Sequence, residues 1–276
     1  MMSFDITSLY TNVPVDEAIN IITTLLNGTD LPTGYIDGVS HCLTSGYFLW
    51  RGDFYQQVNG VAMGSPLAPV VANIYMEWFE GQALTSAPVR PRHWWRYVDD
   101  VFAVINRVHV EEFIAHLNSV HSSIQFTTEK EKDGMLPFLD VLVSRGTDGR
   151  LSHTVYRKPT HTDRYLRADS HHHPSHLASV PRTLINRALN LCDPQYIDAE
   201  FDHLRQVLEN NGYNWRQCTR MASSSTGQER HLMIALLPEK LRRPSQLFNE
   251  AMFCSACLRT DIRITQVNSS PPCRYL

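Results

Sequence analysis

The sequence lacks the features of two specialised classes of protein. Its six cysteines are scattered along 276 residues without dense or regular spacing, which excludes a disulfide-stapled secreted domain as the default and favours reduced thiols. No apolar run reaches the roughly 18 residues that span a bilayer, and the N-terminus has neither the basic region nor the apolar core of a signal peptide. We therefore expect an intracellular protein, in the nucleus or cytoplasm, that does not enter a membrane.

An excess of basic charge is also missing, because 25 Lys and Arg face 28 Asp and Glu and the formal net charge is −3. Phosphate binding depends on how Lys and Arg are clustered, so the net charge does not exclude a nucleic-acid partner. Basic residues do gather after residue 144, interleaved with Tyr156 and Tyr165. Such interleaving suits phosphate and base contacts, and a solvated surface is the alternative. The expected nucleic-acid contacts are Arg157, Lys158, Arg164 and Arg167.

Hydrophobic residues make up 43% of the chain, enough to bury a core in one large domain or two small ones. Helical spacing of apolar residues predicts helices at 14–26, 35–45, 67–80 and 110–120 and two or three short ones after residue 175. Shorter apolar runs predict hairpins at 47–58 and 94–105 and strands at 124–128, 137–144 and 151–157. Helices mixed with mainly antiparallel strands predict an α+β fold.

Two adjacent acids, Asp99 and Asp100, follow an aromatic-rich run that ends at Tyr97 and precede an apolar run from Val101 to Ile105. Two strands that meet at an acidic turn have this pattern. Carboxylates near a hydrophobic sheet are costly to bury unless a cation or strong hydrogen bonds compensate, and oxygen ligands suit Mg²⁺ or Mn²⁺. The run Tyr97-Val98-Asp99-Asp100 therefore indicates a metal site, although a solvated hairpin turn can have the same sequence.

Two earlier segments extend this pattern. Residues 3–14 place Asp5 at the end of a short apolar run, and residues 59–69 form a glycine-bearing loop that leads into an apolar helix. With the acidic turn, these segments resemble motifs A, B and C of the reverse transcriptase palm. The sequences of these motifs resemble those of Penelope-like retroelements, over roughly residues 1 to 215. Two further segments share the resemblance, Leu136-Pro137-Phe138-Leu139-Asp140-Val141 and Tyr156-Arg157-Lys158-Pro159-Thr160.

The resemblance implies an RNA-directed DNA polymerase that adds deoxynucleoside triphosphates to a primer on an RNA or DNA template. Asp5 and Asp99 would be bridging ligands of two Mg²⁺ or Mn²⁺ ions, and Asp100 would act as a third ligand or orient water. Tyr97 would lie on the substrate side of the same turn. Protein partners are unknown at this stage.

Other positions that match the family's motifs are expected to contact the substrate. Tyr10 stands where the family places an aromatic that excludes a ribose 2′-hydroxyl, which favours deoxynucleotides. Gly64, Ser65 and Pro66 would let the backbone approach the nascent base pair and the template. Met63 stands where many relatives have glutamine, so apolar packing would replace an amide contact.

The resemblance also divides the chain into three parts. Residues 1–157 would form the palm, and residues 158–220 would form a helical thumb or helix-turn-helix-like nucleic-acid-binding region. Residues 221–276, after a serine-rich boundary, would be an uncertain and partly disordered tail. In that tail Cys254, Cys257 and Cys273 have zinc-knuckle spacing without an evident fourth ligand, and ordinary thiols are the alternative.

One departure from the family concerns activity. The sequence starts just before Asp5, so the fingers strands that hold the triphosphate and the template in relatives are not part of it. We expect a fragment or decayed copy of a mobile element, and the sequence leaves open whether this fragment is active. The alternative function is a noncatalytic nucleic-acid-binding remnant that acts through the basic helical region.

Overall fold

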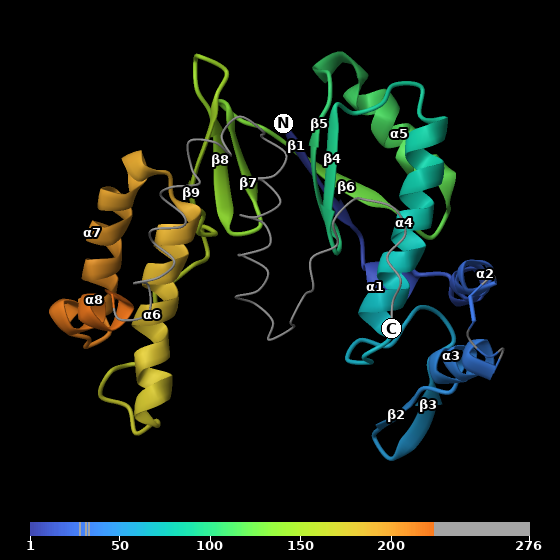
Figure 1. Cartoon of the computed structure of the whole chain (residues 1–276), viewed down its shortest axis with the longest axis horizontal. Helices are drawn as coiled ribbons and strands as arrows, with labels where there is room; N and C mark the ends of the chain where they lie inside the picture. The colour runs from blue at the N-terminus through green and yellow to red at the C-terminus, as the bar shows by residue number, and fades with distance from the viewer. Residues whose placement is uncertain (28, 31, 33, 224–276) are drawn as a thin grey trace. The chain divides into compact units, whose positions relative to one another are not determined.

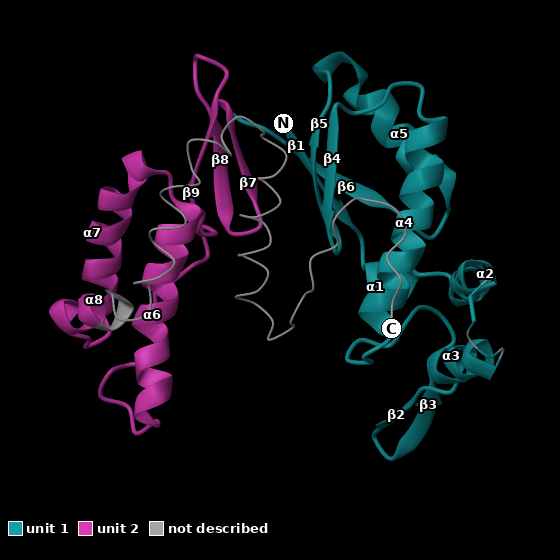
Figure 2. Cartoon of the chain, viewed as in Figure 1, with its two compact units in different colours: residues 1–132 teal, residues 133–276 magenta. Residues whose placement is uncertain are grey.

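The structure, a computed structural model, describes residues 1–27, 29–30, 32 and 34–223. The chain forms two compact units, residues 1–132 and residues 133–276 (Figure 2), which are described separately below. Helices combine with antiparallel sheets in both units, so the predicted α+β fold is confirmed. The cysteines at 254, 257 and 273 lie outside the described residues. Within the described part of the chain, no helix has the length and apolar character needed to cross a membrane.

The first unit contains a four-stranded sheet in the order β4-β5-β1-β6, and every neighbouring pair is antiparallel. The first strand of the chain is therefore an inner strand of the sheet. Its side chains alternate, so that Met2, Phe4 and Ile6 are buried while Asp5 points to the accessible face, as the two-residue period of a strand requires. The four strands are β1 (Met2–Ile6), β4 (His93–Tyr97), β5 (Asp100–Val104) and β6 (Phe126–Lys130).

Two long helices, α4 (Ala68–Ser86) and α5 (Val110–Val120), lie on one side of this sheet (Figure 1). Their core side chains meet those of the strands, because Phe4 makes an edge contact with Phe113 of α5, and Phe79 of α4 packs against Phe126. The hydrophobic core of the unit is thus a layer between helices and sheet. The helix predicted for 67–80 is confirmed and continues to Ser86. The other helices of the unit are α1 (Leu9–Asn12), α2 (Val15–Leu26), α3 (Gly34–Thr44) and the 3₁₀ turn η1 (Arg107–His109).

The hairpin of β2 (Tyr47–Trp50) and β3 (Asp53–Gln56) confirms the one predicted around Arg51 and Gly52. All eight strand residues are exposed. Its aromatic side chains contact one another across the strands: Phe48 stacks on Tyr55, and Tyr47 meets Phe54 edge to face.

The second unit begins with a three-stranded meander of β7 (Met135–Phe138), β8 (Val141–Arg145) and β9 (Leu151–Val155). The prediction of one strand over 137–144 is wrong, because the chain reverses at Leu139 and Asp140 to form the β7–β8 hairpin. Leu139 has a φ of 52°. A leucine in this left-handed region is uncommon, which explains why no turn signal stood in the sequence.

Three helices complete the second unit and pack around a core that includes Leu184, Ala188, Leu204 and Leu208. Prolines in the first turns of α6 and α7 fit the helix starts, since the first helical position needs no N–H donor. The break predicted at Asp193-Pro194 is confirmed. The helices are α6 (Pro174–Leu191), α7 (Pro194–Asn210) and α8 (Trp215–Ser223).

Candidate active site

The sheet of the first unit brings the predicted acids from two strands to one place. Asp5 at the end of β1 is the direct cross-strand partner of Asp100 at the start of β5. The backbone N–H of Ile6 donates to the carbonyl of Asp99 at 2.9 Å, so the end of β1 is also tied to the β4–β5 turn. Residues about 95 positions apart in the sequence therefore converge through the register of one antiparallel pair.

The turn that carries Asp99 is tight and strained. Tyr97 and Asp100 pair across it, which leaves only Val98 and Asp99 between the strands. Val98 has a φ of 53°, a conformation that is a genuine outlier for a β-branched residue. Such strain persists only where the surrounding structure over-determines it, and it occurs frequently at functional sites.

A polar link from α4 supports this turn. The guanidinium of Arg96 donates to Glu80 Oε1 at 2.9 Å, to Asn73 Oδ1 at 3.1 Å and to the carbonyl of Val98 at 3.3 Å. The indole N–H of Trp94 donates to the same Glu80 oxygen at 2.8 Å. Because the side chains of Arg96 and Glu80 are only 8% and 15% exposed, this link is largely shielded from water and positions the turn.

The sequence analysis missed Glu80 and Arg96 as positioning residues. The available signal was that each lies within a largely apolar segment: Glu80 in the helix around residue 76, and Arg96 in the strand around residue 95. Pairing them required knowing that α4 packs against the sheet.

The electrostatics of the site reflect two carboxylates that face each other. Partial burial, and next the negative charge of Asp99, raise the pKa of the Asp5 carboxyl above its ordinary value. The same two causes raise the pKa of the Tyr10 hydroxyl. Asp5, Tyr10 and Asp99 thus lie within electrostatic range of one another. The site has a negative electrostatic potential, which a bound cation would reduce.

The glycine-bearing loop is hydrogen-bonded to the backbone of Tyr10. The N–H of Val61 donates to the carbonyl of Tyr10 at 2.7 Å. Gly60 has a φ of 69°, and a Cβ atom built on it would lie 2.5 Å from the backbone of Thr11. Only glycine permits this approach, so the loop and α1 pack backbone to backbone.

The remaining predicted substrate contacts lie further along this loop. Met63 is 70% exposed, and Gly64, with a φ of 94°, has open space around it. Within the described residues, no hydrogen bond or ion pair joins Met63, Gly64, Ser65 or Pro66 to Asp5 or Asp99. The structure therefore brings Asp5, Tyr10, Asp99 and Asp100 together and leaves the loop tip open to solvent.

The donor set at this site contains oxygen ligands only, as hard divalent cations prefer. The carboxylates of Asp5 and Asp99 repel each other, and a bound divalent cation would offset this repulsion. No group of three or more His, Cys, Asp or Glu side chains is arranged to hold a metal ion in the part of the chain that the structure describes. In their present positions Asp5, Asp99 and Asp100 therefore do not form a three-ligand metal site.

The four predicted nucleic-acid contacts lie in the second unit and differ in their surroundings. Arg157 is bound by Glu200. Arg167 is exposed and paired with Asp169 at 2.8 and 2.9 Å. Lys158 and Arg164 are exposed. Arg157 and Arg167 are therefore each engaged by a carboxylate, whereas Lys158 and Arg164 are exposed, and the contact of all four with nucleic acid stays a prediction.

Two family models match different parts of the chain. Residues 1–135 match the sequence model of the family described as reverse transcriptase (RNA-dependent DNA polymerase). Residues 164–220 match the model of the animal helix-turn-helix domain. No curated protein sequence matches the chain.

Among solved structures, telomerase from Candida albicans in complex with a fragment of telomeric RNA is 12% identical, with a TM-score of 0.51 over 93% of this chain and 44% of that chain. Apo telomerase from Candida tropicalis is 11% identical, with a TM-score of 0.48 over 93% of this chain and 46% of that chain. This chain thus spans less than half the length of these telomerases. The first likeness shows a shared fold, and the sequence match shows that residues 1–135 are similar to reverse transcriptase domains.

Proposed function

We propose that the reverse transcriptase domain of this chain catalyses RNA-directed DNA synthesis, in which a primer 3′-hydroxyl attacks the α-phosphate of a deoxynucleoside triphosphate. The observation that carries the proposal is the convergence of Asp5 and Asp100 as cross-strand partners, with Asp99 in the intervening turn. Carboxylates from separate strands at one point are what two-metal phosphoryl transfer requires.

Asp5 and Asp99, with Asp100 beside them, would hold the divalent metal ions, Mg²⁺ or Mn²⁺. When bound, such ions lower the pKa of the attacking hydroxyl and stabilise the charge on the leaving oxygens. The protein's own part is to keep two carboxylates close together against their mutual repulsion. The Arg96 and Glu80 link does so by fixing the turn that carries Asp99.

Tyr10 would select the sugar of the incoming nucleotide. Its ring lies on α1 within electrostatic range of Asp99, and the Val61 to Tyr10 hydrogen bond fixes the backbone behind it. An aromatic side chain held in this place would collide with a ribose 2′-hydroxyl, which favours deoxynucleotides. Met63, Gly64, Ser65 and Pro66, on the open loop, would close on the template and the nascent base pair when these bind.

We further assign the chain to the Penelope-like retroelements. The support is the wording of the motifs at residues 97–100, 136–141 and 156–160, together with a helix-turn-helix match that follows the reverse transcriptase match on the same chain. The second unit would contact the RNA or DNA template with its primer through Lys158, Arg164 and Arg167.

Primer extension with the full chain tests the catalytic proposal. We expect Mg²⁺-dependent incorporation on a primed RNA or DNA template, and a loss of at least about a hundredfold in Asp99→Asn, because an amide cannot neutralise the charge of a metal ion. Asp37→Asn, which removes an exposed carboxylate from α3 of the same unit, is the matched control and should leave the rate unchanged.

The outcomes separate the two candidate functions. Equal incorporation by the wild-type chain and Asp99→Asn would rule out the assigned site. If the wild-type chain binds a primed template in a salt-sensitive manner but extends no primer, the noncatalytic binding function replaces the catalytic one.

A further inference from the structure

The second unit contains a pocket of about 360 Å³ at the end of β9. Three segments form its walls: the β7–β8 turn with Asp140, the stretch that follows β9 with Lys158, Thr160 and Thr162, and helix α6 with Arg187. Its lining is therefore rich in hydrogen-bond donors. None of these residues belongs to the acidic site of the first unit.

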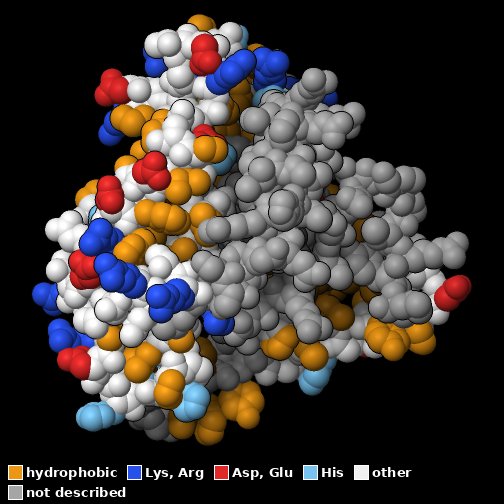
Figure 3. Space-filling model, turned by 60° about the vertical axis from the view of Figure 1, so that its left-hand side comes forward, with side chains coloured by type: hydrophobic (Ala, Val, Ile, Leu, Met, Phe, Trp, Pro, Cys, Tyr) orange, Lys and Arg blue, Asp and Glu red, His pale blue; other side chains and the backbone are white. Residues whose placement is uncertain are grey.

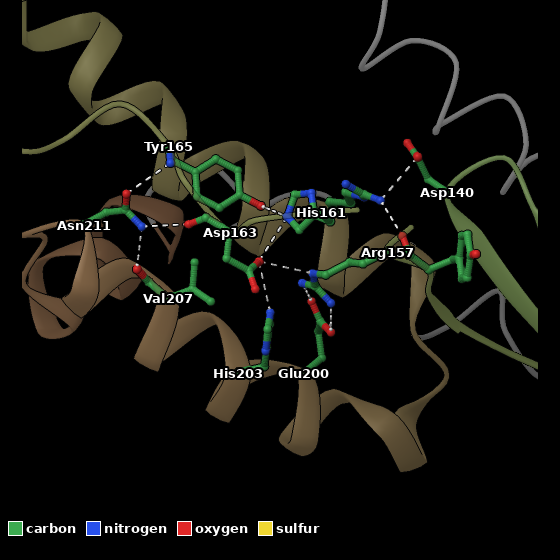
Figure 4. A network of polar contacts seen from close by, with 11 residues as sticks. Asp140, Arg157, His161, Asp163, Tyr165, Glu200, His203, Val207 and Asn211 are labelled. Atoms are coloured by element: carbon green, nitrogen blue, oxygen red, sulfur yellow. Dashed lines mark hydrogen bonds and ion pairs between the residues drawn. The ribbon is translucent and has the colours of Figure 1, made fainter. Parts of the chain in front are cut away.

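Arg157 forms the rigid back of this pocket. Both terminal nitrogens of its guanidinium donate to the carboxylate of Glu200, and its Nε lies 3.8 Å from Asp163 Oδ1 (Figure 4). Burial lowers the pKa of Arg157, but the hydrogen bond and charge of Glu200, with smaller contributions from Tyr165 and Asp163, more than offset that effect and raise it overall. Arg157 is thus held in its charged form, with both terminal nitrogens bound to Glu200. It fixes the backbone that leads into Lys158.

The segment after Lys158 is also joined to α7. Asp163 Oδ1 lies 3.0 Å from Nε2 of His161 and 3.4 Å from Nε2 of His203 of α7 (Figure 4), although neither contact has hydrogen-bond geometry. The side chain of Asn211 donates to the carbonyl of Asp163 at 2.9 Å and accepts from the N–H of Tyr165 at 3.0 Å. This network gives residues 157–165 a fixed shape although they contain no helix or strand.

Two basic groups in the pocket keep donors in reserve. Arg187 donates through Nη2 to the carbonyl of Tyr156 at 3.2 Å and lies 3.4 Å from Asp140. Its Nε is buried and has no hydrogen-bond partner among the described residues, and leaving such a donor unpaired is costly. The side chain as a whole is 21% exposed, so a ligand can reach part of the guanidinium. The ammonium of Lys158 forms no ion pair within the described range either, and it lies at the exposed rim.

From these observations we propose that the pocket binds one phosphate group of a nucleic-acid backbone, with Lys158 and Arg187 as the charged donors and Thr160 and Thr162 as hydroxyl donors at the rim. A tetrahedral phosphate has acceptor oxygens in several directions, which matches donors that come from two segments of the chain. The source of the phosphate rests on the proposed function, whereas the anion site itself does not.

The described part of the molecular face drawn in Figure 3 does not carry an extended basic track. On the described part of the face in Figure 3, Lys and Arg side chains are interspersed with Asp and Glu. The described residues of this face form no continuous positive stripe, so a nucleic acid would bind them through separate anchor points. The pocket supplies one such point.

The test compares binding by the full chain and three variants. Lys158→Gln removes the exposed charge, Arg187→Lys keeps the charge but removes Nε–H, and Arg150→Gln removes a 90% exposed charge at the opposite end of β9 as the matched control. The probes are inorganic phosphate, followed by calorimetry, and a short single-stranded oligonucleotide, followed by fluorescence anisotropy at several salt concentrations. Circular dichroism establishes that each variant is folded.

We expect Lys158→Gln to weaken oligonucleotide binding about five- to tenfold for any sequence and to reduce the salt slope by about one. Arg187→Lys should weaken it similarly, and Arg150→Gln should stay within about twofold of the wild type because an exposed charge is screened. If Arg187→Lys does not fold, the exposed Lys158 variant still decides the question.

Each outcome has a consequence. Phosphate binding that depends on Lys158, without oligonucleotide binding, would keep the anion site but make its ligand a free phosphate, overturning the nucleic-acid source. Binding of both probes that is unchanged in Lys158→Gln and Arg187→Lys would overturn the pocket. Primer extension in Asp99→Asn is a separate readout, so failure of the catalytic proposal leaves this result unaffected.

Discussion

Gly60 is the residue on which the geometry around Tyr10 depends most directly. Its positive φ and its contact with the backbone of Thr11 exclude any Cβ atom. We expect Gly60→Ala to lower the free energy of unfolding by at least about 2 kcal/mol, from strain and overlap together. Urea unfolding of the full chain measures the change.

Gly64 provides the internal control for this prediction. It has a positive φ of 94° but no atoms near its missing Cβ, so Gly64→Ala should cost only the conformational strain, about 1 kcal/mol. Equal losses in the two variants would show that the close approach to Thr11 contributes nothing to stability.

At the scale of single residues, the acids of the candidate site were predictable and their support was not. Asp5, Asp99 and Tyr10 were identified from short motifs, and the structure places them together. Arg157 was predicted to contact nucleic acid, yet it is occupied by Glu200. Sequence spacing reveals that an arginine is present but not whether a carboxylate from a helix some 40 positions later will neutralise it.

At the scale of elements, the link between α4 and β4 determines how the acidic turn is held. Glu80→Ala would leave the guanidinium of Arg96 buried without its carboxylate and the indole of Trp94 without its acceptor. We expect the free energy of unfolding to fall by about 3 to 5 kcal/mol, as when one partner of a buried ion pair is removed. Chemical denaturation measures this loss.

Glu77→Ala is the matched control on the same helix. Glu77 is exposed and accepts one hydrogen bond from Asn73, so its loss should cost about 0.5 kcal/mol or less. If Glu80→Ala is no more destabilising than Glu77→Ala, the link from α4 does not hold the turn.

Elements whose apolar residues recur with a clear helical or strand period were predicted well. The missed β7–β8 turn has a local cause. Helices α2, α3 and α5 and the hairpins β2–β3 and β4–β5 follow from the spacing of their apolar residues. The β7–β8 turn was missed because its left-handed residue is Leu139, which carries none of the usual turn chemistry. There, strand pairing imposed a backbone conformation against local preference.

At the scale of the whole molecule, each compact unit has a hydrophobic core of its own. We expect fragments 1–132 and 133–223 to fold separately, each with a cooperative thermal transition by circular dichroism, because each unit has a core cluster of its own. A fragment 1–105, which lacks α5 and β6 and so exposes one edge of β1, should remain unfolded. A noncooperative 133–223 fragment would contradict the prediction.

The position of β1 inside its sheet also has a consequence for biosynthesis. This strand is made before its partners β5 and β6, which end at residues 104 and 130. At ordinary translation speeds the nascent chain must therefore carry an apolar, unpaired strand for on the order of 10 s before the sheet can close. During that interval the segment is a natural client for a ribosome-associated chaperone.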